Sequence, residues 1–134
     1  MRCRVIYWNE EVMDREQRFL AMRGEDYSDP ALYNVVAAVE IPDTRSLEAE
    51  RYEVADRLFQ KFNIGDHGGV EALRSMSAGD MVAFPDGQAL VCQPAGWKCI
   101  YLAPDFSEHL KVLDDTRFLK RLQVKMQETW GCQT

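Results

Sequence analysis

The sequence lacks several features that mark common protein classes. Only two of its 134 residues are histidine, and its four cysteines never form the Cys-x-x-Cys spacing of redox motifs and zinc knuckles. No stretch approaches the ~20 apolar residues of a membrane span, and the run MRCRVIYW is followed at once by polar Asn9, Glu10 and Glu11. These absences predict a cytoplasmic protein with reduced cysteines, without cofactors and without a membrane partner.

Positive charge is also scarce. The chain has 16 Lys and Arg residues against 22 Asp and Glu residues, a net charge of -6. It therefore lacks the basic footprint that drives binding to phosphate backbones, and no direct contact with nucleic acid is expected. The charge suits a basic protein partner, and it also serves solubility. The length fits one domain with one core, so a single domain is expected over residues 1–134.

Hydrophobic periodicity predicts an α+β fold, with a mainly antiparallel sheet of about five strands and three to four helices. Strands are expected at residues 3–8 and 32–41, although Asp29 followed by Pro30 would also suit a helix start in the second case. Helices are expected at residues 9–23, 47–63 and after Pro104, where a short piece precedes a second one.

The stretch RSMSAGDMVAFPDGQALVCQPAGWKCI, residues 74–100, predicts turns joined by strands. Gly79 is the third residue of Ser-Ala-Gly-Asp, the position at which a type II turn requires a positive φ. Asp86 and Gly87 indicate a two-residue hairpin loop, which would place Val82 opposite Val91. The prediction is a three-strand meander at about residues 80–102. Because both of its faces are apolar, the sheet should be covered on both sides, or its second face should lie under the terminal segments.

A second turn at residues 94–97 would place Cys92 directly opposite Cys99. Such a pair, together with His67, could belong to a small metal or redox protein. Reduced cysteines that pack as small hydrophobic residues are the simpler interpretation. We therefore expect no metal site and no cofactor.

A hydrolytic triad could be built from Ser75 or Ser77, His67, and Asp66 or Asp80. That chemistry needs a base within hydrogen-bond reach of the nucleophile and a third group that orients the base. Nothing in the sequence resembles a nucleophile elbow, and serines in turns usually bond to nearby backbone. The chain is therefore predicted not to be an enzyme.

Several polar and aromatic residues could contact a partner instead. Trp97 at a turn could anchor a partner or fold back over its own sheet. A basic row at helical spacing near the C-terminus, which includes Lys120, could grip an acidic partner, serve a nucleic-acid-linked regulator, or form a solvated helix face. The candidate partner-binding residues are Trp97, Asp66, His67, Asp80, Arg117, Arg121 and Lys125.

The run LFQKFN…DH…RSMSAGDMV…ALVCQPAGWKCI resembles the YodL-like domain, a small family of bacterial, phage and plasmid-borne proteins. The resemblance covers about residues 33–100 and leaves residues 1–31 and 103–134 as flanking elements. It carries no catalytic residue onto this chain, but it implies a mobile-element setting. The expected function is a non-enzymatic module that binds a host protein or protein complex in the host cytoplasm. An inhibitor of a host defence system, such as a CRISPR complex, would be consistent with this expectation. The sequence does not decide whether the chain forms a homodimer.

Overall fold

The computed structural model describes residues 1–25, 27–41, 48–64 and 75–112. In chain order its elements are β1 (Arg2–Trp8), α1 (Arg15–Met22), a 3₁₀ turn (Pro30–Leu32), β2 (Tyr33–Glu40), α2 (Glu48–Ile64), β3 (Met81–Ala83), β4 (Gln88–Gln93), β5 (Gly96–Tyr101), α3 (Pro104–Glu108) and β6 (Lys111–Val112).

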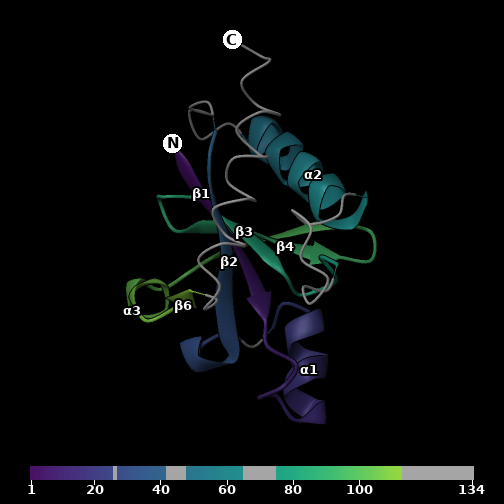
Figure 1. Cartoon of the computed structure of the whole chain (residues 1–134), viewed down its shortest axis with the longest axis vertical. Helices are drawn as coiled ribbons and strands as arrows, with labels where there is room; N and C mark the ends of the chain where they lie inside the picture. Colours follow the sequence, from purple (N-terminus) through teal and green to yellow (C-terminus); the bar gives the residue numbers. More distant parts are fainter. Residues whose placement is uncertain (26, 42–47, 65–74, 113–134) are drawn as a thin grey trace.

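The six described strands form one mixed sheet in the order β5-β4-β3-β1-β2-β6. Neighbouring strands are antiparallel, except for β2 and β6, which are parallel. The α+β class is therefore confirmed, with six strands in the described part of the chain where about five were expected. The first strand, β1, lies inside the sheet between β2 and β3, although residues 1–31 fall outside the family resemblance (Figure 1).

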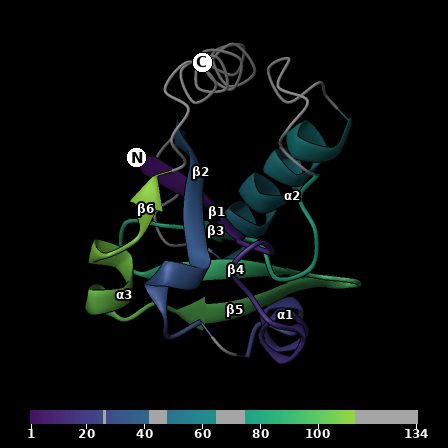
Figure 2. The same ribbon diagram turned by 60° about the horizontal axis from the view of Figure 1, so that its bottom comes forward.

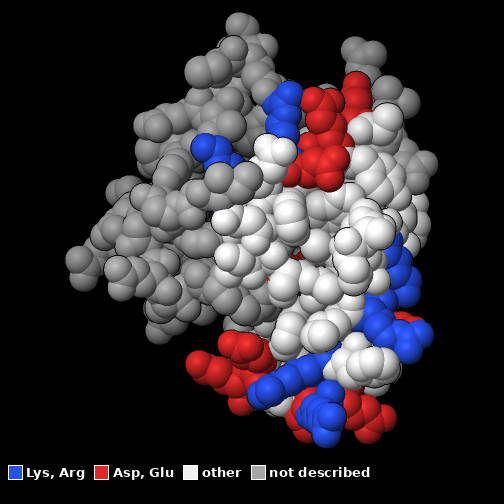
Figure 3. Space-filling view, turned by 90° about the vertical axis from the view of Figure 1, so that its right-hand side faces the viewer, with Lys and Arg blue, Asp and Glu red and all other residues white. Residues whose placement is uncertain are grey.

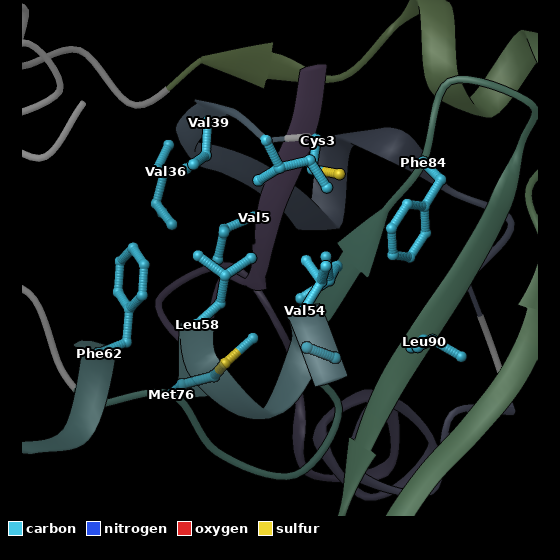
Figure 4. Packing of buried hydrophobic residues seen from close by; sticks show 14 of the residues in the cluster. Cys3, Val5, Val36, Val39, Val54, Leu58, Phe62, Met76, Phe84 and Leu90 are labelled. Carbon is cyan, nitrogen blue, oxygen red and sulfur yellow. The ribbon is translucent and has the colours of Figure 1, made fainter. Parts of the chain in front are cut away.

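Each face of the sheet carries its own apolar cluster, as the two apolar faces of the 81–102 region predicted. On one face α2 packs Val54, Leu58 and Phe62 against strand residues such as Cys3 and Val5 (Figure 4). The opposite cluster includes Ala21 of α1 and Phe106 of α3. Figure 2 shows α2 and α1 on opposite sides of the β4–β5 pair. Both clusters bury apolar surface, which is the main favourable term in folding.

The helix expected at residues 9–23 begins later than its periodicity suggested. Asn9 does not cap it: its side-chain oxygen accepts the amide of Glu11, and its carbonyl accepts the amide of Val12, which makes a separate turn. The cap is Asp14, which exchanges hydrogen bonds with Gln17 in a capping box. The strand expected at residues 32–41 is confirmed as β2, and the alternative helix start at Asp29 and Pro30 gives only a single 3₁₀ turn that leads into it.

The segment after Pro104 is helical only through Glu108, although a helix was expected to run on to Leu113. Lys111 and Val112 instead pair in parallel with β2 as strand β6. The second helical piece expected after this short one lies outside the described residues.

The predicted register of β3 and β4 is wrong by one residue. The amide of Gly87 donates to the carbonyl of Phe84 at 3.1 Å, and the amide of Phe84 donates to the carbonyl of Gln88 at 2.8 Å. The loop therefore has three residues, Pro85 to Gly87, with Gly87 at φ 93°. A type I turn followed by a glycine of positive φ is a common three-residue hairpin loop. Val82 consequently faces Leu90, not Val91.

The register of β4 and β5 also differs from the prediction, here by two residues. Gln93 pairs with Gly96, so the loop consists of Pro94 and Ala95 alone. Gly96 has a φ of 93°, a conformation that glycine adopts without steric cost. Because β5 begins directly after this short loop, Cys99 faces Leu90 and Cys92 faces Trp97. The predicted direct opposition of Cys92 and Cys99 is therefore wrong.

Gly79 forms the expected turn and also makes a close contact. Its φ is 94°, and the amide of Asp80 donates to the carbonyl of Ser77 at 3.0 Å, as in a type II turn. A Cβ atom on Gly79 would lie 2.4 Å from the carbonyl oxygen of Ala21. The turn therefore needs glycine twice, once for its backbone angle and once because the C-terminal end of α1 presses on it.

Replacing Gly79 by alanine tests this second requirement, with Gly96→Ala as the matched control. Both glycines have nearly the same positive φ, but a Cβ on Gly96 would meet no atom within 4 Å. Gly96→Ala should cost about 1–2 kcal/mol of unfolding free energy, the cost of the left-handed conformation alone. Gly79→Ala should cost ~2 kcal/mol more, because the chain must move to relieve the overlap. Urea unfolding measures both; equal losses would contradict the close contact.

Candidate functional site

Five of the seven candidate partner-binding residues lie outside the described part of the chain. These are Asp66, His67, Arg117, Arg121 and Lys125. The two that the structure describes, Asp80 and Trp97, both make contacts within the fold.

Asp80 is fully buried, which corrects the expectation that it contacts a partner. Its carboxylate accepts the amide of Ser77 at 2.8 Å and the amide of Trp8 at 3.2 Å. The Ser77 hydroxyl lies 3.4 Å from the same carboxylate. The indole N–H of Trp8 donates to the carbonyl of Ala78 at 2.9 Å, so β1 is tied to this turn at two points. Asp80 and Ser77 thus hold the turn together, as the structural interpretation of the serines predicted.

Trp97 folds back over its own sheet. Its indole N–H donates to the Asp56 carboxylate of α2 at 2.8 Å. Its ring meets the ring of Phe59 edge-on, with centroids 6.2 Å apart. Trp97 thus connects α2 to β5, and it remains partly exposed at the rim of the first cluster.

Arg51 of α2 is a buried charge that the sequence analysis did not single out. Its guanidinium bonds to Asp86 at 2.9 Å and to the side-chain oxygen of Gln88 at 2.6 Å, and it stacks on the Phe84 ring at 4.5 Å. Its side chain is 5% exposed. The hydrogen bond from Arg51 is the main cause that lowers the pKa of Asp86. The sequence did indicate that Arg51 would be buried, because Arg51 lies three residues before Val54 and therefore on the same face of the helix.

The three described cysteines are free thiols in different surroundings. Burial raises the pKa of Cys3 to about 12. Burial, helped by the charge of Asp80, raises the pKa of Cys92 to about 11. Cys99 is exposed, and its sulfur accepts the side-chain amide of Gln88 at 3.2 Å. Within the described ranges, no group of three or more His, Cys, Asp or Glu side chains could hold a metal ion.

The outer edge of β5 is the clearest candidate for a binding surface. The amide of Leu102 donates to the carbonyl of Gly87 at 2.8 Å, so its backbone groups face the β4 side. Because these groups alternate in direction along an antiparallel strand, those of Trp97, Cys99 and Tyr101 point away from β4. β5 is the last strand on its side of the described sheet, and no described strand pairs with these groups.

The side chains along β5 do little to protect this edge. Tyr101 is 69% exposed, and Cys99 is exposed as well. Lys98 is the one charged residue of the strand, and its ammonium group is held by the carbonyl oxygens of Gly24 at 3.1 Å and Arg23 at 3.4 Å. Natural edge strands are usually guarded by charges, prolines or bulges, because an open edge can pair with another chain.

The surface around the β4–β5 turn carries few charges. Figure 3 views the molecule from the right-hand side of Figure 1, where this turn lies between α2 and α1. Acidic and basic side chains gather in an upper and a lower group, and the described surface between them is almost uncharged. Interface cores are typically depleted of charged residues and enriched in aromatic ones.

None of the described helices is long and apolar enough to cross a membrane. Comparisons with protein-family models, with curated proteins and with solved structures find no match to this chain. The likeness to the YodL-like domain therefore stays a prediction from the residues quoted for it.

Asp86→Asn tests the contact with Arg51 through its pH dependence. A carboxyl whose folded-state pKa is lowered stabilises the fold above its unfolded pKa, near 3.8, and this contribution is lost as the pH falls further. The wild type should therefore be more stable than the variant at neutral pH, and the difference should shrink below about pH 4. Urea unfolding from pH 7 to pH 3 measures this difference. A difference that does not change with pH would exclude the charged contact.

Thiol titration tests the surroundings of the cysteines, in a Cys132→Ser background because Cys132 lies outside the described residues. At pH 8 one thiol, Cys99, should react at once with an aromatic disulfide reagent, and two should react only after unfolding. Adding Cys99→Ser should abolish the fast phase. Burial raises the pKa of Cys3 from 9.0 to about 12, so above pH 9 the thiol ionises in the unfolded chain and stays protonated in the folded one. The free energy of unfolding should therefore fall as the pH rises above 9. A second fast thiol would contradict the burial of Cys3 and Cys92.

Proposed function

We propose that the chain is a non-enzymatic protein-binding module that pairs the outer edge of β5 with an extended segment of another protein. The observation that carries this proposal is the row of outward backbone groups at Trp97, Cys99 and Tyr101, which no described strand pairs. Adding a strand to an open sheet edge is a general mode of recognition, in which main-chain hydrogen bonds supply affinity and alternate side chains supply specificity.

The surroundings of the edge suit such an interaction. Tyr101 offers an exposed aromatic ring at one end of the strand, and the nearly uncharged surface lies at the other end, by the β4–β5 turn. The edge is also rigid, because Trp97 ties β5 to α2 and Lys98 ties it to the end of α1. A preformed strand loses little conformational freedom on binding, which favours affinity.

The kind of partner is inferred from the sequence. The net charge of -6 favours a partner with a basic surface, and it disfavours direct binding to nucleic acid. The resemblance to the YodL-like domain suggests a phage or plasmid setting, in which the partner is a host protein complex in the cytoplasm. A defence complex of the CRISPR type is the partner to test first.

Two substitutions at one position separate edge pairing from other modes of binding. Cys99→Pro removes an N–H group that points away from β4 and should leave the β4–β5 ladder intact, because proline is tolerated on edge strands. Cys99→Ser changes the side chain and keeps the N–H group. Affinity capture from bacteria that express a CRISPR complex should recover that complex with the wild type and with Cys99→Ser. Cys99→Pro should recover at least ~10-fold less, a loss of about 1.4 kcal/mol in binding.

Circular dichroism and urea unfolding of both variants establish that the fold is intact. Equal capture by Cys99→Pro and Cys99→Ser would exclude the edge as the binding surface. Failure of the wild type to recover the complex at low salt would exclude it as the partner.

A further inference from the structure

The face of the sheet that carries α1 and α3 has a hollow built around two arginines. It has a volume of about 320 Å³ and is lined by Arg2, Arg4, Ala83, Phe84, Pro85, Gly87 and Ser107. Arg2 and Arg4 are two residues apart on β1, so they lie on one face of the sheet. None of the residues that line the hollow belongs to β5, the strand of the proposed protein-binding edge.

Small neighbours leave the Arg4 side chain room. Arg4 pairs with Ala38 of β2 on one side and with Ala83 of β3 on the other. A methyl group on either side cannot cover a guanidinium, so the charged end of Arg4 faces the hollow. On the α3 side of the hollow, Arg4 Nη1 donates a hydrogen bond to the carbonyl oxygen of Ser107 at 3.2 Å.

The charge of Arg4 is poorly compensated. A guanidinium has five N–H donors, and a carbonyl satisfies one of them without neutralising any charge. Arg4 has no carboxylate within 4.0 Å among the described residues, and it is only partly exposed. Partial burial without a counter-charge disfavours the charged form, and accordingly the pKa of Arg4 is lowered. An anion in the hollow would supply the missing partner.

Arg2 should contribute less than Arg4 to anion binding in the hollow. Its guanidinium is already engaged with Glu40, with Nε 3.2 Å from the carboxylate, and its side chain is 64% exposed. Glu40 also lies 4.0 Å from the N-terminal ammonium of Met1, and of the two arginines in the hollow Arg4 is the one with no carboxylate within 4.0 Å among the described residues. One positive charge matches a monoanion. The apolar groups of Ala83 and Pro85 line this side of the hollow and suit an apolar group attached to that anion.

We propose that this hollow binds a carboxylate carried on a small apolar body, with Arg4 as the anchoring residue. The planar guanidinium matches the two oxygens of a carboxylate in a bidentate, charge-assisted pair. The ligand is either a free branched organic acid or the C-terminal carboxylate of a peptide that ends in an apolar residue. Both present the same group to Arg4, and two probes distinguish them.

The test is a titration of the full ¹⁵N-labelled chain, followed by amide shifts at Ala83, Gly87 and Ser107. Isovalerate should cause saturable shifts there, and isovaleramide, of the same shape but without charge, should cause none. N-acetyl-glycyl-leucine is the peptide probe, and a stronger response to it than to isovalerate assigns the site to peptide ends. Inorganic phosphate should bind more weakly than both carboxylates.

Matched variants assign the binding to Arg4. Arg4→Gln should weaken isovalerate binding by at least ~10-fold, because the charge is lost. Arg4→Lys should weaken it by a few-fold, because the charge stays and the planar fork is lost. Arg2→Gln should change it by less than ~3-fold, since Arg2 is engaged with Glu40.

Equal shifts with isovaleramide, or unchanged binding in Arg4→Gln, would overturn the proposal. The same holds if Arg2→Gln abolishes binding while Arg4→Gln retains it. If Arg4→Gln does not fold, as judged by circular dichroism, the comparison of Arg4→Lys with the wild type decides, and unchanged affinity there would count against a bidentate pair.

Discussion

The buried carboxylate of Asp80 is the interaction on which the arrangement of the fold depends. It accepts amide groups from Ser77, in its own turn, and from Trp8, at the end of β1. A buried charge is tolerated only when hydrogen bonds replace its water, and these amides do so. The carbonyl of Asp80 also accepts the amide of Cys92 at 2.7 Å, so one residue joins the turn to both β1 and β4. Gly79, next to it, lets α1 approach the same turn.

The sequence predicted the elements whose signals are local. The β-branched and aromatic residues of β1 and the apolar face of α2 indicated both elements to within a residue or two at each described end. The positive φ of Gly79 also followed from its turn position. The register of the strand pairs did not follow from the sequence. Phe-Pro-Asp-Gly and Gln-Pro-Ala-Gly both have proline second and glycine fourth, and yet they close loops of three and two residues. Pairing with the neighbouring strand decides between such loops, and a single sequence does not contain that information.

The candidate sites were harder to predict for the same reason. The sequence located β5, but its position at the edge follows from the strand order, in which β1 takes the central place. The hollow at Arg4 depends on Ala38 and Ala83, which lie far apart in the chain and meet only when β2 and β3 flank β1. Arg51 was different, since its helical face could have been read from the spacing alone.

The central position of β1 has a consequence for synthesis. Val5 pairs with Ala37 on one side and with Val82 on the other. During translation the pairing with β2 can form early, whereas the edge that faces β3 must wait until the residues up to Val82 have been added. Until then the nascent chain exposes an apolar strand edge, and such edges are prone to aggregate. Conditions that slow elongation between β2 and β3 should accordingly favour loss of the polypeptide to chaperones and proteases before its sheet is complete.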